Sequence, residues 1–385
     1  MSLMYDVYDF GLMLADRVRT EAYVRALRQA VTPGCTVLEI GSGTGLFAML
    51  ARRWGAGRVF AIEMLDTIEL APAIAEANGL AEGIEFIRGI STQLDLPAKA
   101  DVLVSDLRGA LPLHQLHLPS IIDARDRLLA PGGVQIPQQD RIRGAVVEAP
   151  SMFRGLQGPW ETERFDIDHA AVRHIAANTW RRWHKGDMET ARPLTPTADW
   201  ATIDYTRIQS AHCAGDLNWT VERAGTAHGM NFWFDATLLP GIEYSTDPEG
   251  PGLVYGNAFF PLPRPVELLE GDEISYLLRA DLIGARYVWT WRTTIRSRHS
   301  EPVEFTQSTF YSTALGRRDL AIQASGHTPS LGIGGRLLKT ALELMDGSRT
   351  LEVIAEELER ACPSRFTEWD SALSWVRQLS REYSA

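Results

Sequence analysis

The residues best placed for chemistry form a glycine-rich turn that directly follows an apolar strand. The run Val37-Leu38-Glu39-Ile40 leads into Gly41, Gly43 and Gly45, and a helical pattern begins at Leu46. Alternating glycines allow a tight turn and let a ligand lie against bare backbone. The spacing does not fit the dinucleotide fingerprint, and no lysine follows Gly45 as it would in a P-loop. The turn therefore disfavours NAD-dependent redox chemistry.

A second acidic residue, Glu63, ends the next predicted strand. A carboxylate at that strand end can accept hydrogen bonds from both ribose hydroxyls of a bound nucleoside. Glu39 precedes the glycine turn and Glu63 follows it, so the three features together predict a nucleoside-bearing ligand. The alternative is a purely structural strand–helix turn with an exposed glutamate.

Residues 31–140 have the pattern of an α/β domain, in which short β-branched runs alternate with helical patterns. This alternation predicts a Rossmann-like parallel sheet with helices on both faces. Ligands of such sheets bind at the carboxyl ends of the strands, where Asp106 lies. The predicted strands are Thr36–Ile40, Arg58–Glu63, Ile84–Arg88 and Asp101–Ser105, and the predicted helices are Leu46–Trp54, Ile68–Asn78 and Ser120–Leu129.

The rest of the chain divides into two regions with different residue patterns. Residues 141–325 contain aromatic, β-rich runs separated by Gly/Pro/Asp clusters, which predict an antiparallel barrel or sandwich. A more helical stretch interrupts this region near residues 161–185. Residues 331–385 predict a small helical module, in which Thr350 is placed to cap a helix that runs through Leu358.

Composition excludes several classes of protein. The chain has 385 residues and a net charge of −11, which argues against a protein whose main task is to bind nucleic acid. We find neither an apolar stretch long enough to cross a membrane nor a signal peptide. Cys35, Cys213 and Cys362 lie far apart and fit neither a disulfide framework nor a zinc site, so we expect a cytoplasmic protein with no metal.

Several segments extend the glycine turn into a recognisable pattern, namely Tyr5–Gly11, Met13–Thr20, Gly55–Glu63, Val104–Gly109 and Ala124–Gly133. With them the sequence resembles class I methyltransferases and, more narrowly, the protein arginine methyltransferase family. The resemblance covers roughly residues 5–295. It implies that S-adenosylmethionine is the methyl donor and S-adenosylhomocysteine the product.

The resemblance also implies roles for individual residues around the donor. Helices within residues 1–30 would close over it, and Arg19 would pair with its methionine carboxylate, for which the planar fork of arginine is suited. Ser91 and Thr92 match the segment that contacts adenine in the family, although the family often has Glu where Thr92 stands. Glu39, Gly41, Gly43, Gly45 and Glu63 complete the predicted donor site.

Family members place a helical dimerisation arm within their barrel, and Arg164–Val172 occupies the corresponding position, which implies a homodimer. A local helix packed on its own barrel is the alternative. The tail resembles small winged-helix peptide-binding modules of the PqqD type, and a plain stabilising appendage is the other interpretation.

The acceptor site departs from the family pattern, in which two glutamates clamp a guanidinium and a barrel-loop histidine supports them. The first position holds Asp106, the second holds the neutral Gln115, and the Thr-His-Trp loop lines up with Leu253–Tyr255. Arg108 would repel a cationic acceptor if it points inward. His114 offers a proton acceptor near neutral pH.

These features place Asp106, Gln115 and His114 in the catalytic site and predict a methyltransferase that acts on a protein or peptide side chain. Arginine is in doubt as the acceptor because Gln115 carries no charge. Two alternatives stay open at this point: a methyltransferase for small molecules, and a donor-binding scaffold without catalytic activity.

Overall fold

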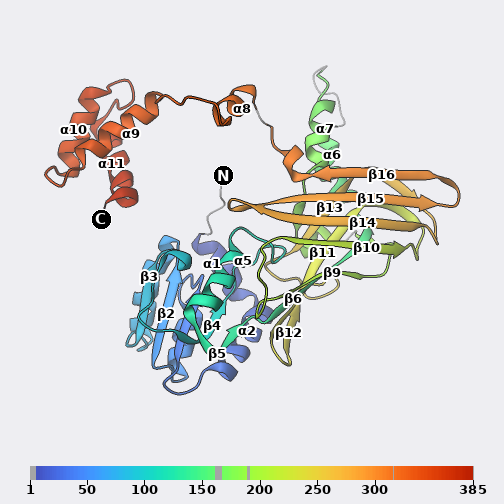
Figure 1. Ribbon diagram of the computed structural model, residues 1–385, viewed down its shortest axis with the longest axis horizontal. Helices are drawn as coiled ribbons and strands as arrows, with labels where there is room; N and C mark the ends of the chain where they lie inside the picture. Colours follow the sequence, from blue (N-terminus) through green and yellow to red (C-terminus); the bar gives the residue numbers. More distant parts are fainter. Residues whose placement is uncertain (1–5, 161–166, 189–190, 315, 385) are drawn as a thin grey trace. The chain divides into compact units, whose positions relative to one another are not determined.

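The computed structural model describes residues 6–160, 167–188, 191–314 and 316–384 (Figure 1). It divides into two compact units, residues 1–314 and residues 315–385. The first unit contains a parallel sheet, two antiparallel sheets and the helices that cover them. The second contains only helices among its described residues.

Two helices open the described chain, α1 (Val7–Ala15) and α2 (Arg17–Ala30). Asp16 separates them and caps α2, because its side chain accepts a hydrogen bond from the backbone N–H of Arg19 at 3.1 Å. The buried residues of α2 recur at helical spacing and include Tyr23. Arg19 lies on this same buried face, so the helix directs a cation toward the interior.

The parallel sheet has five strands in the order β3-β2-β1-β4-β5. The direction of chain progression reverses between β1 and β4, which is where open α/β sheets form their ligand crevice. The predicted Rossmann-like sheet is thus confirmed, and three of the four predicted strands have the expected bounds. The strands are β1 (Thr36–Ile40), β2 (Arg58–Glu63), β3 (Ile84–Arg88), β4 (Ala100–Ser105) and β5 (Leu129–Ile136).

Strand β5 was not among the predicted strands. It contains Pro131-Gly132-Gly133, residues typical of turns, and Gly132 has a φ of +79°. The helices also differ from expectation in detail, because 3₁₀ or π turns extend two of them. They are α3 (Leu46–Arg53), a 3₁₀ turn over Asp66–Leu70, α4 (Ala71–Ala77), a 3₁₀ turn over Ser91–Gln93, α5 (His117–Asp123) and a π turn over Ala124–Leu128.

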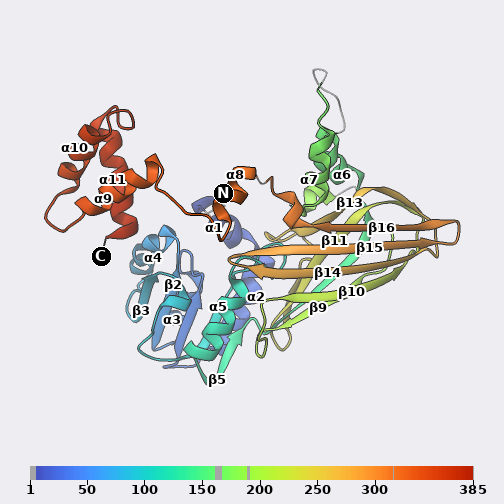
Figure 2. The same ribbon diagram turned by 45° about the horizontal axis from the view of Figure 1, so that its top comes forward.

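The second half of the first unit consists of antiparallel strands, as predicted, arranged in two sheets (Figure 2). Inward-facing aromatic side chains such as Phe232, Phe260 and Trp289 fill the space between strands. The strands are β6 (Gln139–Glu148), β7 (Arg181–Trp183), β8 (Arg192–Pro193), β9 (Ala198–Asp204), β10 (Cys213–Thr220), β11 (Gly225–Leu239), β12 (Ile242–Ser245), β13 (Asn257–Leu268), β14 (Glu273–Ile283), β15 (Arg286–Ser297) and β16 (Ser300–Ser308).

Helices α6 (Pro150–Gln157) and α7 (Ala170–Ala177) lie side by side and project from the antiparallel sheets (Figures 1 and 2). The segment predicted as a dimerisation arm, 161–185, overlaps α7 and β7, while its residues 161–166 lie outside the described residues. Short 3₁₀ turns flank this region over Gly158–Trp160, Lys185–Met188 and Thr309–Ser312.

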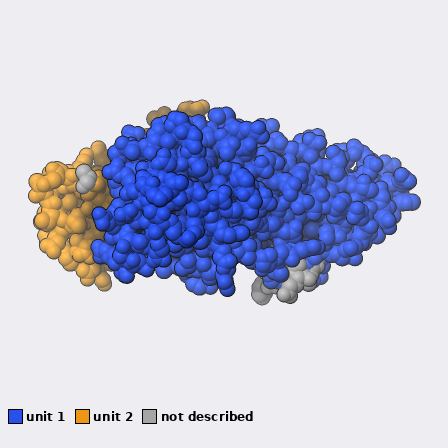
Figure 3. Space-filling view, turned by 90° about the horizontal axis from the view of Figure 1, so that it is seen from below, with its two compact units in different colours: residues 1–314 blue, residues 315–385 orange. Residues whose placement is uncertain are grey.

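The second unit, residues 315–385, is orange in Figure 3 and has a core of its own. Leu337, Leu358 and Leu373 come from three different helices and are buried together. Thr350 caps its helix as predicted, accepting a hydrogen bond from the backbone N–H of Val353 at 3.4 Å. The helices are α8 (Arg317–Gln323), α9 (Ile333–Leu344), α10 (Leu351–Ala361) and α11 (Trp369–Tyr383).

Within the described ranges, none of the helices is sufficiently long and apolar to cross a membrane. The three cysteines form no disulfide. Across the same ranges, no group of three or more histidine, cysteine or acidic side chains is gathered to hold a metal ion.

Because the second unit has a separate core, we expect Leu358→Ala to loosen that unit alone. Leu358 is fully buried, and truncation of such a leucine costs roughly 2–5 kcal/mol. Hydrogen exchange followed by mass spectrometry should show lost protection in peptides from 331–385 and unchanged protection in the parallel sheet. Leu342→Ala, at a side chain that is 38% exposed, is the matched control. Equal loss of protection in both units would contradict separate cores.

Candidate active site

The glycine turn has a backbone that only glycine adopts easily. Gly41, Gly43 and Gly45 have φ values of +75°, +53° and +81°. A side chain at Gly41 would collide with Leu107, and one at Gly43 would collide with the ring of Phe10. The turn therefore lies directly beneath α1, which supplies Phe10, and beside the chain that follows β4. This arrangement agrees with N-terminal helices that cover a ligand on the turn.

Two buried glutamates fix the turn in place. Glu39 Oε2 accepts a hydrogen bond from the backbone N–H of Ala48 at 2.7 Å, which anchors the start of α3. Glu63 Oε2 accepts from the N–H of Gly43 at 2.9 Å, and its Oε1 accepts from Leu65 at 3.0 Å. Glu63 thus stands at the carboxyl end of β2 in direct contact with the glycine turn, where the sequence places the ribose.

Burial controls the protonation of Glu39. Desolvation is the largest effect on its carboxyl and raises the pKa, as does the nearby charge of Glu63, whereas the hydrogen bond from Ala48 and the charge of Arg19 lower it. The resulting pKa is about 8. The raised pKa favours the protonated form of Glu39 at neutral pH.

The predicted adenine segment lies next to this edge. Ser91 is buried in the 3₁₀ turn that follows β3, and its backbone carbonyl accepts a hydrogen bond from Arg127 Nη2 at 2.8 Å. Thr92 beside it is exposed. The backbone N–H of Gly89 donates to the carbonyl of Glu63 at 2.9 Å, which keeps this turn close to the end of β2.

On the other side of the sheet's switch point lies a cluster of four charged side chains, Arg19, Asp106, Arg108 and Asp140, which we name the buried ionic cluster. Arg19 Nε donates to Asp106 Oδ2 at 2.6 Å, and Arg108 Nη1 donates to Asp106 Oδ1 at 3.1 Å. Arg108 also binds Asp140 bidentately, through Nε at 2.6 Å and Nη2 at 2.9 Å. All four side chains are at most 9% exposed.

Tyrosines complete this cluster. Tyr255 donates to Asp106 Oδ2 and lies 2.9 Å from the hydroxyl of Tyr244. Arg108 Nη1 donates to the hydroxyls of Tyr23 at 2.6 Å and Tyr244 at 3.1 Å. The residues come from α2, the chain after β4, the barrel strands and the barrel loop, so the cluster joins the parallel sheet to the antiparallel sheets.

The cluster keeps Asp106 ionised. Burial alone would raise the pKa of this carboxyl, but the charges of Arg19 and Arg108 outweigh burial, and the pKa lies below its ordinary value. The sequence predicts separate roles for these two residues: Asp106 would bind the methyl acceptor, and Arg19 would bind the methyl donor. The structure brings them together as one ion pair.

The barrel loop is anchored to the N-terminal helices. The backbone N–H of Val254 donates to Asp16 Oδ2 at 2.8 Å, so the residue that caps α2 also holds the loop. This contact sets Tyr255 beside Arg19, whose Nε lies 3.1 Å from the tyrosine hydroxyl.

The other two predicted catalytic residues lie further along the chain after β4. His114 is half-buried, and desolvation together with the charge of Arg182 lowers its pKa to about 4, so the imidazole is neutral at pH 7 and weakly basic. Gln115 is exposed and has a φ of +42°, a conformation that no other described non-glycine residue shares. His114 and Gln115 are thus more exposed than the side chain of Asp106, which lies within the buried ionic cluster.

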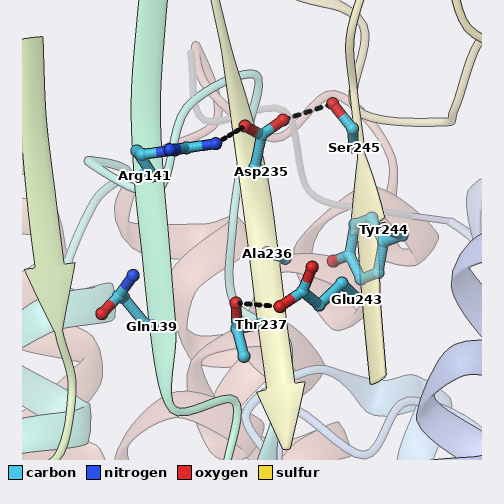
Figure 4. Close-up of a pocket in the computed structure, with 8 residues that line it drawn as sticks. All are labelled: Gln139, Arg141, Asp235, Ala236, Thr237, Glu243, Tyr244 and Ser245. Atoms are coloured by element: carbon cyan, nitrogen blue, oxygen red, sulfur yellow. Dashed lines mark hydrogen bonds and ion pairs between the residues drawn. The ribbon is translucent and has the colours of Figure 1, made fainter. Parts of the chain in front are cut away.

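A hollow of about 480 Å³ lies on the barrel between β6, β11 and β12 (Figure 4). Its charged side chains have polar partners within the hollow, since Arg141 Nη2 lies 3.1 Å from Asp235 and Thr237 donates to Glu243 at 3.3 Å. Tyr244 lines it and also belongs to the site through its hydroxyl.

Comparison with known proteins agrees with this geometry. Residues 18–134 match the family model of ribosomal protein L11 methyltransferase (PrmA). The chain is 31% identical over 276 residues to an arginine N(omega)-methyltransferase of Streptomyces achromogenes subsp. streptozoticus, a match that covers 69% of this chain and 74% of that protein. This chain belongs to the protein arginine methyltransferase family.

Other relatives extend the same pattern. The chain is 28% identical over 233 residues to the probable protein arginine N-methyltransferase 6 of Arabidopsis thaliana, covering 58% of this chain and 52% of that protein. The Trypanosoma brucei PRMT1 enzyme–prozyme heterotetrameric complex with AdoHcy has the same fold, with a TM-score of 0.70 and 18% identity over 78% of this chain and 97% of that one. For Arabidopsis thaliana protein arginine methyltransferase 10 the TM-score is 0.67 at 22% identity, covering 79% and 98%.

The chain is therefore an S-adenosylmethionine-dependent methyltransferase. A donor-binding scaffold without activity is not favoured by these relatives. Sequence reasoning grouped Glu39, the glycine turn and Glu63 because they lie close together in the chain, and the structure places Glu63 in contact with Gly43. Their role in donor binding stays a prediction. Sequence reasoning did not identify Asp140, Tyr244 or Tyr23, which reach the site from elements far apart in the chain.

The protonated Glu39 should give this methyltransferase a distinctive pH dependence. The unfolded chain releases the proton near the ordinary pKa of 4.5, whereas the folded protein holds it until about pH 8. The contribution of Glu39 to stability therefore falls as the pH rises through this window, by about 1.4 kcal/mol for each unit by which its pKa is raised.

We expect Glu39→Gln to remove this loss, which urea unfolding at pH 5 and pH 8 can measure. Relative to the wild type, the variant should therefore gain free energy of unfolding at pH 8 compared with pH 5. Glu85→Gln, at an exposed position of β3, is the matched control. Parallel pH profiles for Glu39→Gln and the wild type would show that Glu39 is ionised in the folded protein.

Proposed function

We propose that this enzyme transfers a methyl group from S-adenosylmethionine to a guanidino nitrogen of an arginine side chain in a protein or peptide. The observation that carries this proposal is the buried contact between Glu63 and the glycine turn at one side of the switch point, with the Arg19–Asp106 ion pair at the other. The names of the relatives support arginine as the acceptor.

The residues present fit the donor. Glu63 would accept hydrogen bonds from the ribose hydroxyls, while the bare backbone of Gly41, Gly43 and Gly45 would lie against the nucleoside. Ser91 and Thr92 would flank the adenine. The hydrogen bonds of Arg19 to other described residues use its Nε and Nη1, so Nη2 can bind the methionine carboxylate while Nε remains on Asp106.

Bound donor supplies a sulfonium whose methyl carbon bonds to the acceptor nitrogen while the carbon–sulfur bond breaks and its electron pair stays on sulfur. The chain must align the acceptor, exclude water and receive the proton that nitrogen loses. We assign the alignment to Asp106 and Gln115. His114, neutral at pH 7, is the proposed proton acceptor.

Free arginine is a second candidate acceptor. The name of the 31% identical relative specifies arginine alone, whereas the names of the plant relatives specify protein arginine. An amino acid and a peptide side chain would present the same guanidino group to Asp106, so the two candidates differ only in what surrounds that group.

We also propose that the enzyme acts as a homodimer through α6 and α7. These helices project from the antiparallel sheets instead of lying flat upon them (Figure 2). Cytoplasmic residence is part of the same proposal, because the three cysteines remain thiols, as the reducing cytoplasm would keep them.

Glu63→Ala should weaken binding of S-adenosylhomocysteine, since the variant loses the proposed ribose acceptor and the anchor of Gly43. We expect the dissociation constant to rise by about one to two orders of magnitude, as for loss of charge-assisted hydrogen bonds. Isothermal titration calorimetry measures it, with Glu69→Ala at an exposed neighbouring position as the control. Unchanged affinity would refute the placement of the ribose.

Transfer from methyl-labelled donor should identify the acceptor class. With an extract of cells and with free arginine as separate substrates, label should enter protein or the amino acid, and amino-acid analysis should recover it as methylarginine. Label in protein alone supports the first candidate, and label in arginine alone supports the second. Label on any other residue would overturn the guanidino assignment.

A further inference from the structure

The buried ionic cluster contains more charge than methyl transfer requires. Arg108 and Asp140 are both 0% exposed in their side chains and bind each other bidentately. Neither was assigned a role in donor or acceptor binding. Burial of such a pair costs desolvation energy, so we ask what its presence beside Asp106 does for the site.

Arg108 reaches Asp106 from the side opposite Arg19. Its Nη1 donates to Oδ1 of Asp106, whereas Arg19 Nε and the hydroxyl of Tyr255 occupy Oδ2. Both carboxylate oxygens are thus engaged by groups of the chain itself. Arg108 is completely enclosed, so it acts on an acceptor through Asp106 and is a positioning residue.

Asp106 faces two arginines, and Arg108 stands between it and the second carboxylate, that of Asp140. Asp140 is saturated by Arg108 and by the hydroxyl of Tyr205. A guanidinium that approaches Asp106 would meet a carboxylate already neutralised by two cations. In a buried site of low dielectric constant, that third cation gains little from the carboxylate and is repelled by both arginines.

We propose that the Arg108–Asp140 pair is a specificity determinant that makes the acceptor site nearly indifferent to positive charge. The site then selects its acceptor by shape and hydrogen bonding, and a planar guanidino group is held without a strong cation clamp. This inference rests on the proposed function, since it concerns the same acceptor site.

The proposal predicts how strongly the wild-type enzyme distinguishes a charged from a neutral acceptor. A peptide with arginine and the same peptide with citrulline, its neutral isostere, should bind with affinities that differ by less than about tenfold, because net attraction for the cation is small. Binding is measured by calorimetry in the presence of saturating S-adenosylhomocysteine. A preference of a hundredfold or more for the arginine peptide would overturn the proposal.

Removal of both Arg108 and Asp140 should create a preference for the arginine peptide over the citrulline peptide. In the double variant Arg108→Met/Asp140→Asn the total charge is unchanged and Asp106 keeps Arg19 as its one cation. The amide introduced in place of the Asp140 carboxylate keeps an oxygen that can accept from Tyr205. We expect the arginine-to-citrulline affinity ratio to rise by about tenfold, with the affinity for citrulline nearly constant. An unchanged ratio in a folded variant would contradict the proposal.

A matched control removes an exposed ion pair from the same barrel strands. Arg141 and Asp235 lie on β6 and β11 and are 45% and 25% exposed. Arg141→Met/Asp235→Asn should leave the ratio unaltered, because solvent screens that pair. Circular dichroism and affinity for S-adenosylhomocysteine establish whether each variant is folded, and the wild-type ratio decides the proposal if the buried double variant does not fold.

The two proposals fail in different ways. Absence of methyl transfer to arginine in the wild type would overturn the proposed function, while the affinity ratio could still be measured. Transfer to arginine together with a hundredfold preference over citrulline would overturn only the role of Arg108 and Asp140. Failure of both the arginine peptide and free arginine to bind the wild type would overturn both.

Discussion

The ion pair between Arg19 and Asp106 is the interaction on which the site depends. It joins α2 to the end of β4, and through Arg108 and Asp140 it continues into strand β6 of the barrel. Buried charges are stable only when they are paired with good geometry, and removal of one partner leaves the other uncompensated. The N-terminal helices, the parallel sheet and the barrel must therefore close in the one arrangement that satisfies all four groups.

This constraint explains why tyrosines surround the cluster. A buried arginine presents five N–H donors, more than two carboxylates can accept in a planar arrangement. The hydroxyls of Tyr23 and Tyr244 both lie within hydrogen-bond distance of Arg108 Nη1, the nitrogen that also contacts Asp106, and each hydroxyl belongs to a different element. The barrel loop is fixed twice, through the backbone of Val254 and through Tyr255, so its position follows from the same network.

The two halves of the site were unequally predictable from sequence. The predicted donor-binding residues lie within one strand–turn–helix segment and the next strand. Local spacing therefore suffices to predict Glu39, the three glycines and Glu63. The acceptor half is assembled from α2, the chain after β4, β6 and β12. Spacing along the chain cannot show that Arg19 meets Asp106, because 87 positions separate them.

Asp140 shows what a closer inspection of periodicity could have found. Residues on one face of a strand alternate, and Asp140, Ile142 and Gly144 share the inward face of β6. A lone acid on an otherwise apolar face predicts a buried cation partner, although only the fold identifies that partner as Arg108. Strand β5 escaped prediction because Pro131 and Gly132 interrupt it: they lie in the irregular stretch between Leu129 and Val134, the two positions that flank the register shift in its pairing with β4.

The difference in predictability between the two parts of the site has a physical cause. Backbone geometry constrains the donor side, because the positive φ values of Gly41, Gly43 and Gly45 favour glycine and Glu63 anchors Gly43. The acceptor side is constrained by charge balance instead, and charge balance can be met in more than one way. Arg108 could not stand at its buried position without Asp140, nor Asp140 without Arg108, because each alone would leave an unpaired charge at the domain junction. The pair therefore changes the electrostatics of Asp106 as one unit while the rest of the cluster retains its geometry.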